Sequence, residues 1–191
     1  MDPPRPSRCP AKALSVWLDT LVFLGDFIDR GPDSRGVLEQ VIALAQHCTV
    51  VPLLGNHEEM LLAALEGQSE LRYWLKFGGT EALATYGYRG GPELRPADLR
   101  ALSPAEHLQF IKTCRDYFEA VRHIFVHAYY EPERPLHEQP WGGLRWASLP
   151  PVPKPHYSGK VAIVGDTPQT SSEVLGLGHL KCLDSFCHGG G

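Results

Sequence analysis

The segment Gly25–Gly31 holds two aspartates and an arginine that suit metal and phosphate chemistry. Asp26 and Asp29 are three residues apart, and Arg30 follows them. In a tight turn after the apolar run Leu21–Leu24, both carboxylates can point towards one centre, and the planar guanidinium suits phosphate oxygens. A capped turn with a surface ion pair is the plainer interpretation of these residues alone.

Polar residues of similar chemistry follow three further apolar runs. Asn56 and His57 come after 50–54, His127 comes after 124–126, and Asp166 comes after 161–164. Open α/β sheets bind ligands at the carboxyl ends of their strands, so we expect these side chains to lie near Asp26. Each is an ordinary turn or core residue on its own, but the repetition favours a shared site. Oxygen and imidazole ligands in this mixture suit Mn²⁺, Fe or Zn²⁺ rather than a soft copper site.

A hard cation beside an arginine is the arrangement that phosphate-ester hydrolysis needs. His57, placed next to Asp29, would act as the general acid that protonates the leaving oxygen, with Asp29 fixing its tautomer. Arg145 adjoins Trp146 in the sequence. It would be either a second phosphate contact or a cation packed on the indole ring.

The elements that must position these residues alternate between strands and helices. Residues 19–191 are predicted to form one domain behind a proline-rich, disordered tail at 1–18. The apolar runs predict strands at 21–24, 50–54, 124–126, 161–164 and 180–183. Helices are expected from a cap at Asp33 or Ser34 to about residue 45, from about 58 to 65, and through most of 68–118. Residues 129–157 are predicted to be a loop.

Composition excludes several classes of function. A formal charge of −4 gives no reason to expect nucleic acid or an anionic membrane as partner. No run approaches the roughly 18 apolar residues of a membrane span, and the first residues lack the apolar centre of a secretory signal. The five cysteines include no CxxC pair, which favours reduced thiols in a cytoplasmic protein.

The motifs resemble those of the calcineurin-like metallophosphoesterases. The segment at 25–31 is a GDxxDRG motif, and Gly55-Asn56-His57-Glu58 is a GNHE motif. More narrowly, the chain resembles the bacterial and phage serine/threonine protein phosphatase branch, which includes symmetrical diadenosine tetraphosphatases. The segments at 74–79, 125–128 and 165–169 are similar to the later conserved blocks of that branch.

The resemblance implies a fold and a set of roles. The expected fold is α/β (α+β), a β-sandwich of mixed sheets flanked by helices. Asp26 would bridge two metals, Asn56 and His127 would bind the second of them, and His57 with Asp29 would supply the general acid. Arg30 would clamp the phosphate, with Asn56 also contacting the substrate. Mn²⁺ is the expected metal, with Fe or Zn²⁺ as alternatives.

Two departures from the family pattern qualify these expectations. No GDxHG motif, which binds the first metal, precedes residue 25, so the chain is expected to be truncated at its N-terminus and to lack the first strand. Asp166 stands where the family has a histidine, and it remains a predicted metal ligand. The chain is therefore expected to hold at most one metal well.

Three functions follow as alternatives. The first is a metal-dependent phosphomonoesterase of the serine/threonine phosphatase type, acting on a phosphorylated protein or a small phosphoester. The second is a symmetrical dinucleoside tetraphosphate hydrolase. The third is a degenerate, non-catalytic module that binds phosphate or a partner, which the missing first motif favours.

Overall fold

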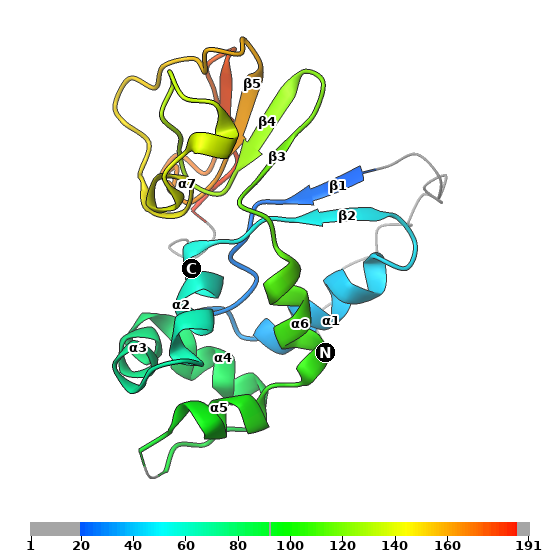
Figure 1. Ribbon diagram of the computed structural model, residues 1–191, viewed down its shortest axis with the longest axis vertical. Coiled ribbons are helices and arrows are strands. Elements are labelled where there is room, and N and C mark those ends of the chain that lie inside the picture. Colours follow the sequence, from blue (N-terminus) through cyan, green and yellow to red (C-terminus); the bar gives the residue numbers. More distant parts are fainter. Residues whose placement is uncertain (1–19, 92, 187–191) are drawn as a thin grey trace, which may run out of the picture.

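The computed structural model describes residues 20–91 and 93–186 of the 191-residue chain. The predictions of a disordered tail at 1–18 and of a missing first strand lie outside the described residues. The described residues form a mixed α/β fold with helices and two sheets, as predicted (Figure 1).

The strands form one small and one larger sheet. The two-stranded sheet pairs β1 and β2 in parallel, and the five-stranded sheet has the order β3-β4-β5-β7-β6. In the larger sheet β4, β5 and β7 run parallel, while β3 and β6 are antiparallel edge strands. The strand bounds are β1 Thr20–Phe23, β2 Thr49–Pro52, β3 Tyr117–Glu119, β4 His123–Val126, β5 Val161–Val164, β6 Leu175–Gly176 and β7 Leu180–Cys182.

Most helices lie between β2 and β3 in the sequence. The α-helices are α1 Ser34–Leu44, α2 Asn56–Ala64, α3 Gln68–Trp74, α4 Thr80–Thr85, α5 Pro96–Leu102, α6 Ala105–Thr113 and α7 Trp141–Trp146. A π-helical turn, η1, spans Leu75–Gly79, and a 3₁₀ turn, η2, spans Leu136–Glu138. Asp33 caps α1 by accepting a hydrogen bond from the Gly36 amide at 2.9 Å, so the cap predicted there is confirmed.

Two hydrophobic cores divide the molecule into a helical half and a sheet half (Figure 1). The core of the helical half packs residues between 27 and 111 around Trp74, Leu38 and Leu71. The core of the sheet half packs residues between 124 and 182 around Ile124 and Leu144. An isolated bridge between Leu53 and Arg115 joins the end of β2 to the segment that leads into β3.

The predicted elements were mostly right, although β6 was not predicted and several other elements differ. The helix expected from about residue 58 begins at Asn56, so Asn56 and His57 lie in its first turn rather than before it. The loop predicted at 129–157 contains η2 and α7. The middle segment predicted as helical ends before β3, which starts at Tyr117. Within the described residues, no helix is both long and apolar enough to cross a membrane.

Candidate metal and phosphoester site

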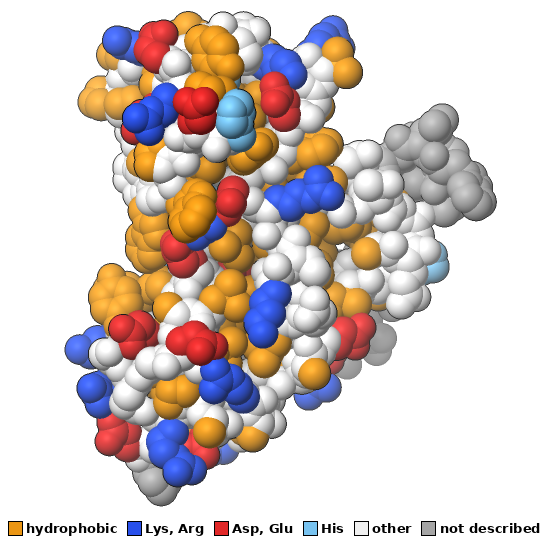
Figure 2. All heavy atoms as spheres, in the orientation of Figure 1, with side chains coloured by type: hydrophobic (Ala, Val, Ile, Leu, Met, Phe, Trp, Pro, Cys, Tyr) orange, Lys and Arg blue, Asp and Glu red, His pale blue; other side chains and the backbone are white. Residues whose placement is uncertain are grey.

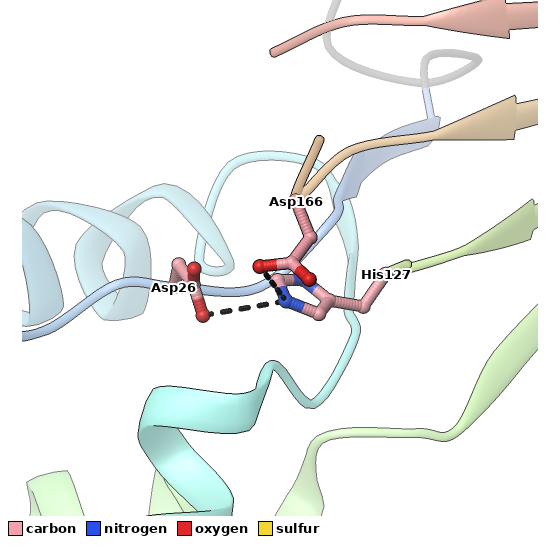
Figure 3. A group of neighbouring side chains, drawn as sticks. All are labelled: Asp26, His127 and Asp166. Atoms are coloured by element: carbon pink, nitrogen blue, oxygen red, sulfur yellow. Dashed lines mark ion pairs between the residues drawn. The ribbon is translucent and has the colours of Figure 1, made fainter. Parts of the chain in front are cut away.

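Three predicted ligands from three strand ends converge where the two halves meet. Ligand atoms of Asp26, His127 and Asp166 all lie within 4.8 Å of one another. His127 Nε2 is 3.5 Å from an oxygen of each carboxylate, and the three side chains point towards one another (Figure 3). His127 and Asp166 follow β4 and β5, which are parallel neighbours in the larger sheet, while Asp26 follows β1 of the smaller sheet.

Asn56 joins this group from the start of α2. Its Nδ2 donates to Asp166 Oδ1 at 3.2 Å, while its Oδ1 is buried and has no hydrogen-bond partner among the described residues. His127 Nε2 is buried and lacks a partner in the same way. Buried polar atoms are nearly always satisfied, so two orphaned acceptors beside two carboxylates fit one divalent cation.

The tautomer of His127 suits it to bind a cation. Its Nδ1–H donates to the carbonyl of Leu24 at 2.5 Å, which leaves Nε2 facing the carboxylates. Burial lowers the pKa of His127, but the close approach of Asp166 and the charges of Asp26 and Asp166 outweigh it and raise that pKa to about 9. The ring therefore lies in a strongly negative electrostatic environment, which favours the binding of a cation.

His57 and Asp29 form a buried pair beside this group. His57 Nδ1–H donates to Asp29 Oδ2 at 2.7 Å, and the indole N–H of Trp74 donates to the same oxygen at 2.8 Å. Burial lowers the pKa of His57, but the hydrogen bond with Asp29 and the charges of Asp26 and Asp29 together raise it. The pair thus favours a protonated imidazole, and its Nε2 makes no hydrogen bond to the described residues, so it can serve a reacting group.

The backbone around these residues is strained in a consistent way. Asp26, Asp29, Arg30 and Asp166 all have positive φ, between 54° and 74°. Such conformations are uncommon for residues other than glycine and gather at functional sites. Gly25 has φ 99°, and a Cβ there would lie 2.6 Å from the Gly55 amide nitrogen, so only glycine lets the two motifs approach.

Arg30 is exposed, and Gly78 packs closely against its backbone. Gly78 has φ 116°, and a Cβ there would come within 2.8 Å of the Arg30 amide nitrogen and of the Asp29 side chain. The turn η1 therefore packs directly on the GDxxDRG segment. The guanidinium of Arg30 has no hydrogen bond or ion pair within the described part of the chain, which leaves it open to an anion.

Glu58 holds the loop that carries Asp26. Its fully buried carboxylate accepts hydrogen bonds from the amides of Gly55, Asp26, Phe27 and Ile28, at 2.8 to 3.3 Å. Burial and the charge of Asp26 raise the pKa of Glu58 to about 7. One carboxylate thus fixes both motifs relative to each other.

Arg145 takes neither of the two roles expected for it. Its guanidinium donates to Glu59 at 2.7 Å and also binds Asp116, and its side chain is only 10% exposed. The indole N–H of Trp146 donates to Glu59 at 2.6 Å. Arg145 therefore ties α7 of the sheet half to α2 of the helical half.

The hydrogen bonds of Trp74 to Asp29 and of Glu58 to the Asp26 loop were not predicted from the sequence. Trp74 belongs to a block noted only for its resemblance, and nothing in that block signals a hydrogen bond to a residue 45 positions away. Glu58 stands three residues after the helix-capping Gly55, a spacing typical of a capping box, which predicts one of its four hydrogen bonds. The other three depend on the tertiary fold.

Replacing Trp74 with Phe should destabilise the protein by about 1.5–3 kcal/mol, because Asp29 loses one of two donors in a buried place. The loss should appear as a lower midpoint of urea unfolding. Trp141→Phe is the matched control, since Trp141 is 68% exposed and its replacement should change stability by less than about 0.5 kcal/mol. Equal midpoints for the two variants would contradict the role assigned to the Trp74 indole.

Comparison with known proteins assigns the chain to a family. The family model described as calcineurin-like phosphoesterase matches residues 9–152, which is most of the chain. The chain belongs to the calcineurin-like phosphoesterase family. This membership implies a divalent metal. Among the described residues, the side chains of Asp26, His127, Asp166 and Asn56 form a group that fits one.

Individual relatives match over shorter segments. A symmetrical bis(5′-nucleosyl)-tetraphosphatase of Acidovorax sp. (strain JS42) is 53% identical over 49 residues, 26% of this chain and 17% of that protein. Serine/threonine-protein phosphatase 1 of Salmonella typhimurium (strain LT2) is 46% identical over 61 residues, 32% of this chain and 26% of that protein. These matches thus span only about a sixth to a quarter of the relatives' own lengths.

A solved structure extends the likeness to the fold. The cold-active protein-tyrosine phosphatase of a psychrophilic Shewanella species has a TM-score of 0.63 with 19% sequence identity, over 87% of this chain and 60% of that one. The chain therefore shares its fold with part of that larger protein, and at 19% identity the likeness extends to the fold alone.

Proposed function

We propose that this protein is a divalent-metal-dependent phosphoester hydrolase, most simply a phosphomonoesterase of the serine/threonine phosphatase type. The proposal rests on two neighbouring groups. One is the set of predicted metal ligands Asp26, His127 and Asp166, which we call the cation cluster, and the other is the candidate general acid His57. His57 Nδ1 lies 2.7 Å from Asp29, and ligand atoms of Asp26, His127 and Asp166 lie within 4.8 Å of one another. Metal-assisted hydrolysis needs both parts.

The residues would hold a metal through two carboxylates, one imidazole and one amide oxygen. A divalent cation bound there would supply Lewis acidity, neutralising charge on the phosphoryl oxygens and activating a water. Mn²⁺ is the ion we propose, with Fe or Zn²⁺ as alternatives, because all suit oxygen and imidazole donors. Asp26, Asn56, His127 and Asp166 are the proposed ligands.

The chain's own groups would do the remaining work. Arg30 would bind the phosphoryl oxygens through its exposed guanidinium, assisted by Asn56 at the amino end of α2, where helix amides favour an anion. His57 would give its Nε2 proton to the leaving oxygen. Asp29 would keep that imidazole oriented and charged, while the Trp74 N–H holds Asp29 in place.

A second candidate is hydrolysis of a symmetrical dinucleoside tetraphosphate. It is favoured by the similarity to the Acidovorax protein, a symmetrical bis(5′-nucleosyl)-tetraphosphatase. The same groups would serve both reactions, since each cleaves a bond between phosphorus and a bridging oxygen. The third possibility, a non-catalytic module, would keep the anion-binding groups but give no turnover.

Residues 19–191 are proposed to act as a single domain in a cytoplasmic setting.

Hydrolysis of p-nitrophenyl phosphate tests the proposal. We expect Mn²⁺ to stimulate release of p-nitrophenolate and a chelator to stop it, because the cation activates the water. Asp26→Asn should lower the Mn²⁺-dependent rate at least about tenfold by removing a charged ligand. Absence of turnover with Mn²⁺, Fe²⁺ and Zn²⁺ alike would reject the hydrolase and leave the binding module. Rates on diadenosine tetraphosphate and on a phosphoserine peptide separate the two substrates.

A further inference from the structure

A pocket of about 520 Å³ lies along the helix that begins at the proposed site. Glu59, Met60 and Ala63 of α2 form one wall, and Asn56 lies on the same face of that helix one turn earlier. Figure 2 shows apolar and acidic side chains gathered at the waist where the helical half meets the sheet half. The pocket therefore lies on the helix face that begins at Asn56, one turn beyond that residue.

The opposite walls of the pocket present aromatic side chains. Tyr73 comes from α3 and is 49% exposed, and Trp146 comes from α7 and is 42% exposed. The charged groups in the lining are both acids, Glu59 and Glu70. Arg145 neutralises part of this charge, but it is shared between Glu59 and Asp116 and so leaves an excess of negative charge.

This combination suits a cation rather than a nucleotide. A guanidinium or ammonium group can stack on an indole or phenol ring and pair with a carboxylate at once. A nucleobase could also stack there, but the phosphates of a dinucleoside tetraphosphate would bring further negative charge towards Glu59 and Glu70. Like charges repel, so the two acids of the lining disfavour that ligand.

We propose that this pocket binds a basic side chain, arginine or lysine, of a phosphopeptide whose phosphoryl group lies at the cation cluster. This assignment rests on the phosphomonoesterase function proposed above and adds a substrate preference to it. The pocket wall from Met60 to Ala63 lies about 6–10 Å beyond Asn56 at 1.5 Å per helical residue. An extended peptide covers that distance in about two or three residues at 3.3 Å each.

Peptide binding tests the assignment without requiring turnover. The probes are fluorescently labelled peptides with a non-hydrolysable phosphonate in place of phosphoserine and an arginine two or three residues to either side. Matched peptides carry citrulline, which keeps the shape of arginine and removes its charge. With Mn²⁺ present, we expect one arginine position to bind about fivefold tighter than its citrulline counterpart.

Variants of the pocket should remove that preference selectively. Glu70→Gln should bring the arginine and citrulline peptides to nearly equal affinity, and Tyr73→Ala should weaken the arginine peptide while Tyr73→Phe keeps it. Glu81→Gln, at an exposed acid of α4 outside the pocket, is the control and should change nothing. Hydrolysis of p-nitrophenyl phosphate should stay at the wild-type rate in all four variants, because that substrate has no group to reach the pocket.

The outcomes separate this assignment from the general function. Equal affinity for all arginine and citrulline peptides in the wild-type protein would overturn the basic subsite. A loss of activity on diadenosine tetraphosphate in Tyr73→Ala, without any loss of peptide binding, would overturn it in favour of a nucleobase. If no metal supports hydrolysis of p-nitrophenyl phosphate, the hydrolase proposal fails, while the peptide affinities still decide what the pocket binds.

Discussion

Replacing His57 with Asn should lower kcat for phenyl phosphate by about 10²- to 10⁴-fold, the usual contribution of a positioned general acid. Asn keeps a polar group that can donate to Asp29, as His57 Nδ1 does at 2.7 Å. It has no second nitrogen from which a proton could pass to the leaving phenolate. The variant therefore removes the proton donor while keeping its partner satisfied.

A second leaving group makes this expectation specific. The p-nitrophenolate ion is a weak base and departs with little need for a proton. His57→Asn should therefore lower kcat much less for p-nitrophenyl phosphate than for phenyl phosphate. The metal content of both proteins should agree, since His57 is not among the proposed ligands. His47→Asn, at an exposed histidine, is the control. A loss of equal size on both substrates would mean that His57 positions other groups and donates no proton.

The sequence predicted the ends of strands far better than it predicted connections. The apolar runs that became β1, β2, β4 and β5 are continuous and end in polar residues, so period and turn chemistry agree there. The strand β3 has three residues and β6 has two, too few for any periodic signal. The helix α7 was not predicted because two of its six residues are glycines, which have low helix propensity, and because the surrounding segment is rich in proline.

The proximity of His127 and Asp166 could be expected because β4 and β5 run parallel and end at the same edge of one sheet. Asp26 follows β1 of the other sheet, so its approach to them depends on how the two sheets meet. The support around them could not be expected either. Trp74 reaches Asp29 across 45 residues, and Trp146 reaches Glu59 across 87. Such contacts depend on how α3 and α7 pack, which a single sequence does not reveal.

The packing also explains why the proposed site depends on the contact between the two halves. Asp26 and Asn56 belong to the helical half, whereas His127 and Asp166 follow strands of the sheet half. Arg145 bridges these halves through Glu59 and Asp116. A rigid connection of this kind lets ligands from separate cores keep the sub-ångström placement that a metal site needs.

Glu58→Gln should give the largest loss of stability, about 2–6 kcal/mol, because two backbone amides would lose their acceptor at about 1–3 kcal/mol each. Oε1 of Glu58 accepts from Phe27 and Ile28, and Oε2 accepts from Gly55 and Asp26. Gln replaces one oxygen with an NH₂ group, which then faces two N–H donors. A wild-type stability near the middle of the usual range of about 5–15 kcal/mol leaves the variant folded and its unfolding measurable.

The same replacement should weaken metal binding, because Asp26 has φ 55° and its amide is held by Glu58 at 2.8 Å. Urea unfolding measures the first effect, and titration calorimetry with Mn²⁺ measures the second. Glu81→Gln is the matched control, since an exposed change of the same chemistry should stay within about 0.5 kcal/mol of wild type. If Glu58→Gln and Glu81→Gln unfold at the same urea concentration, Glu58 does not hold the Asp26 loop, and the strained backbone there must be fixed by other contacts.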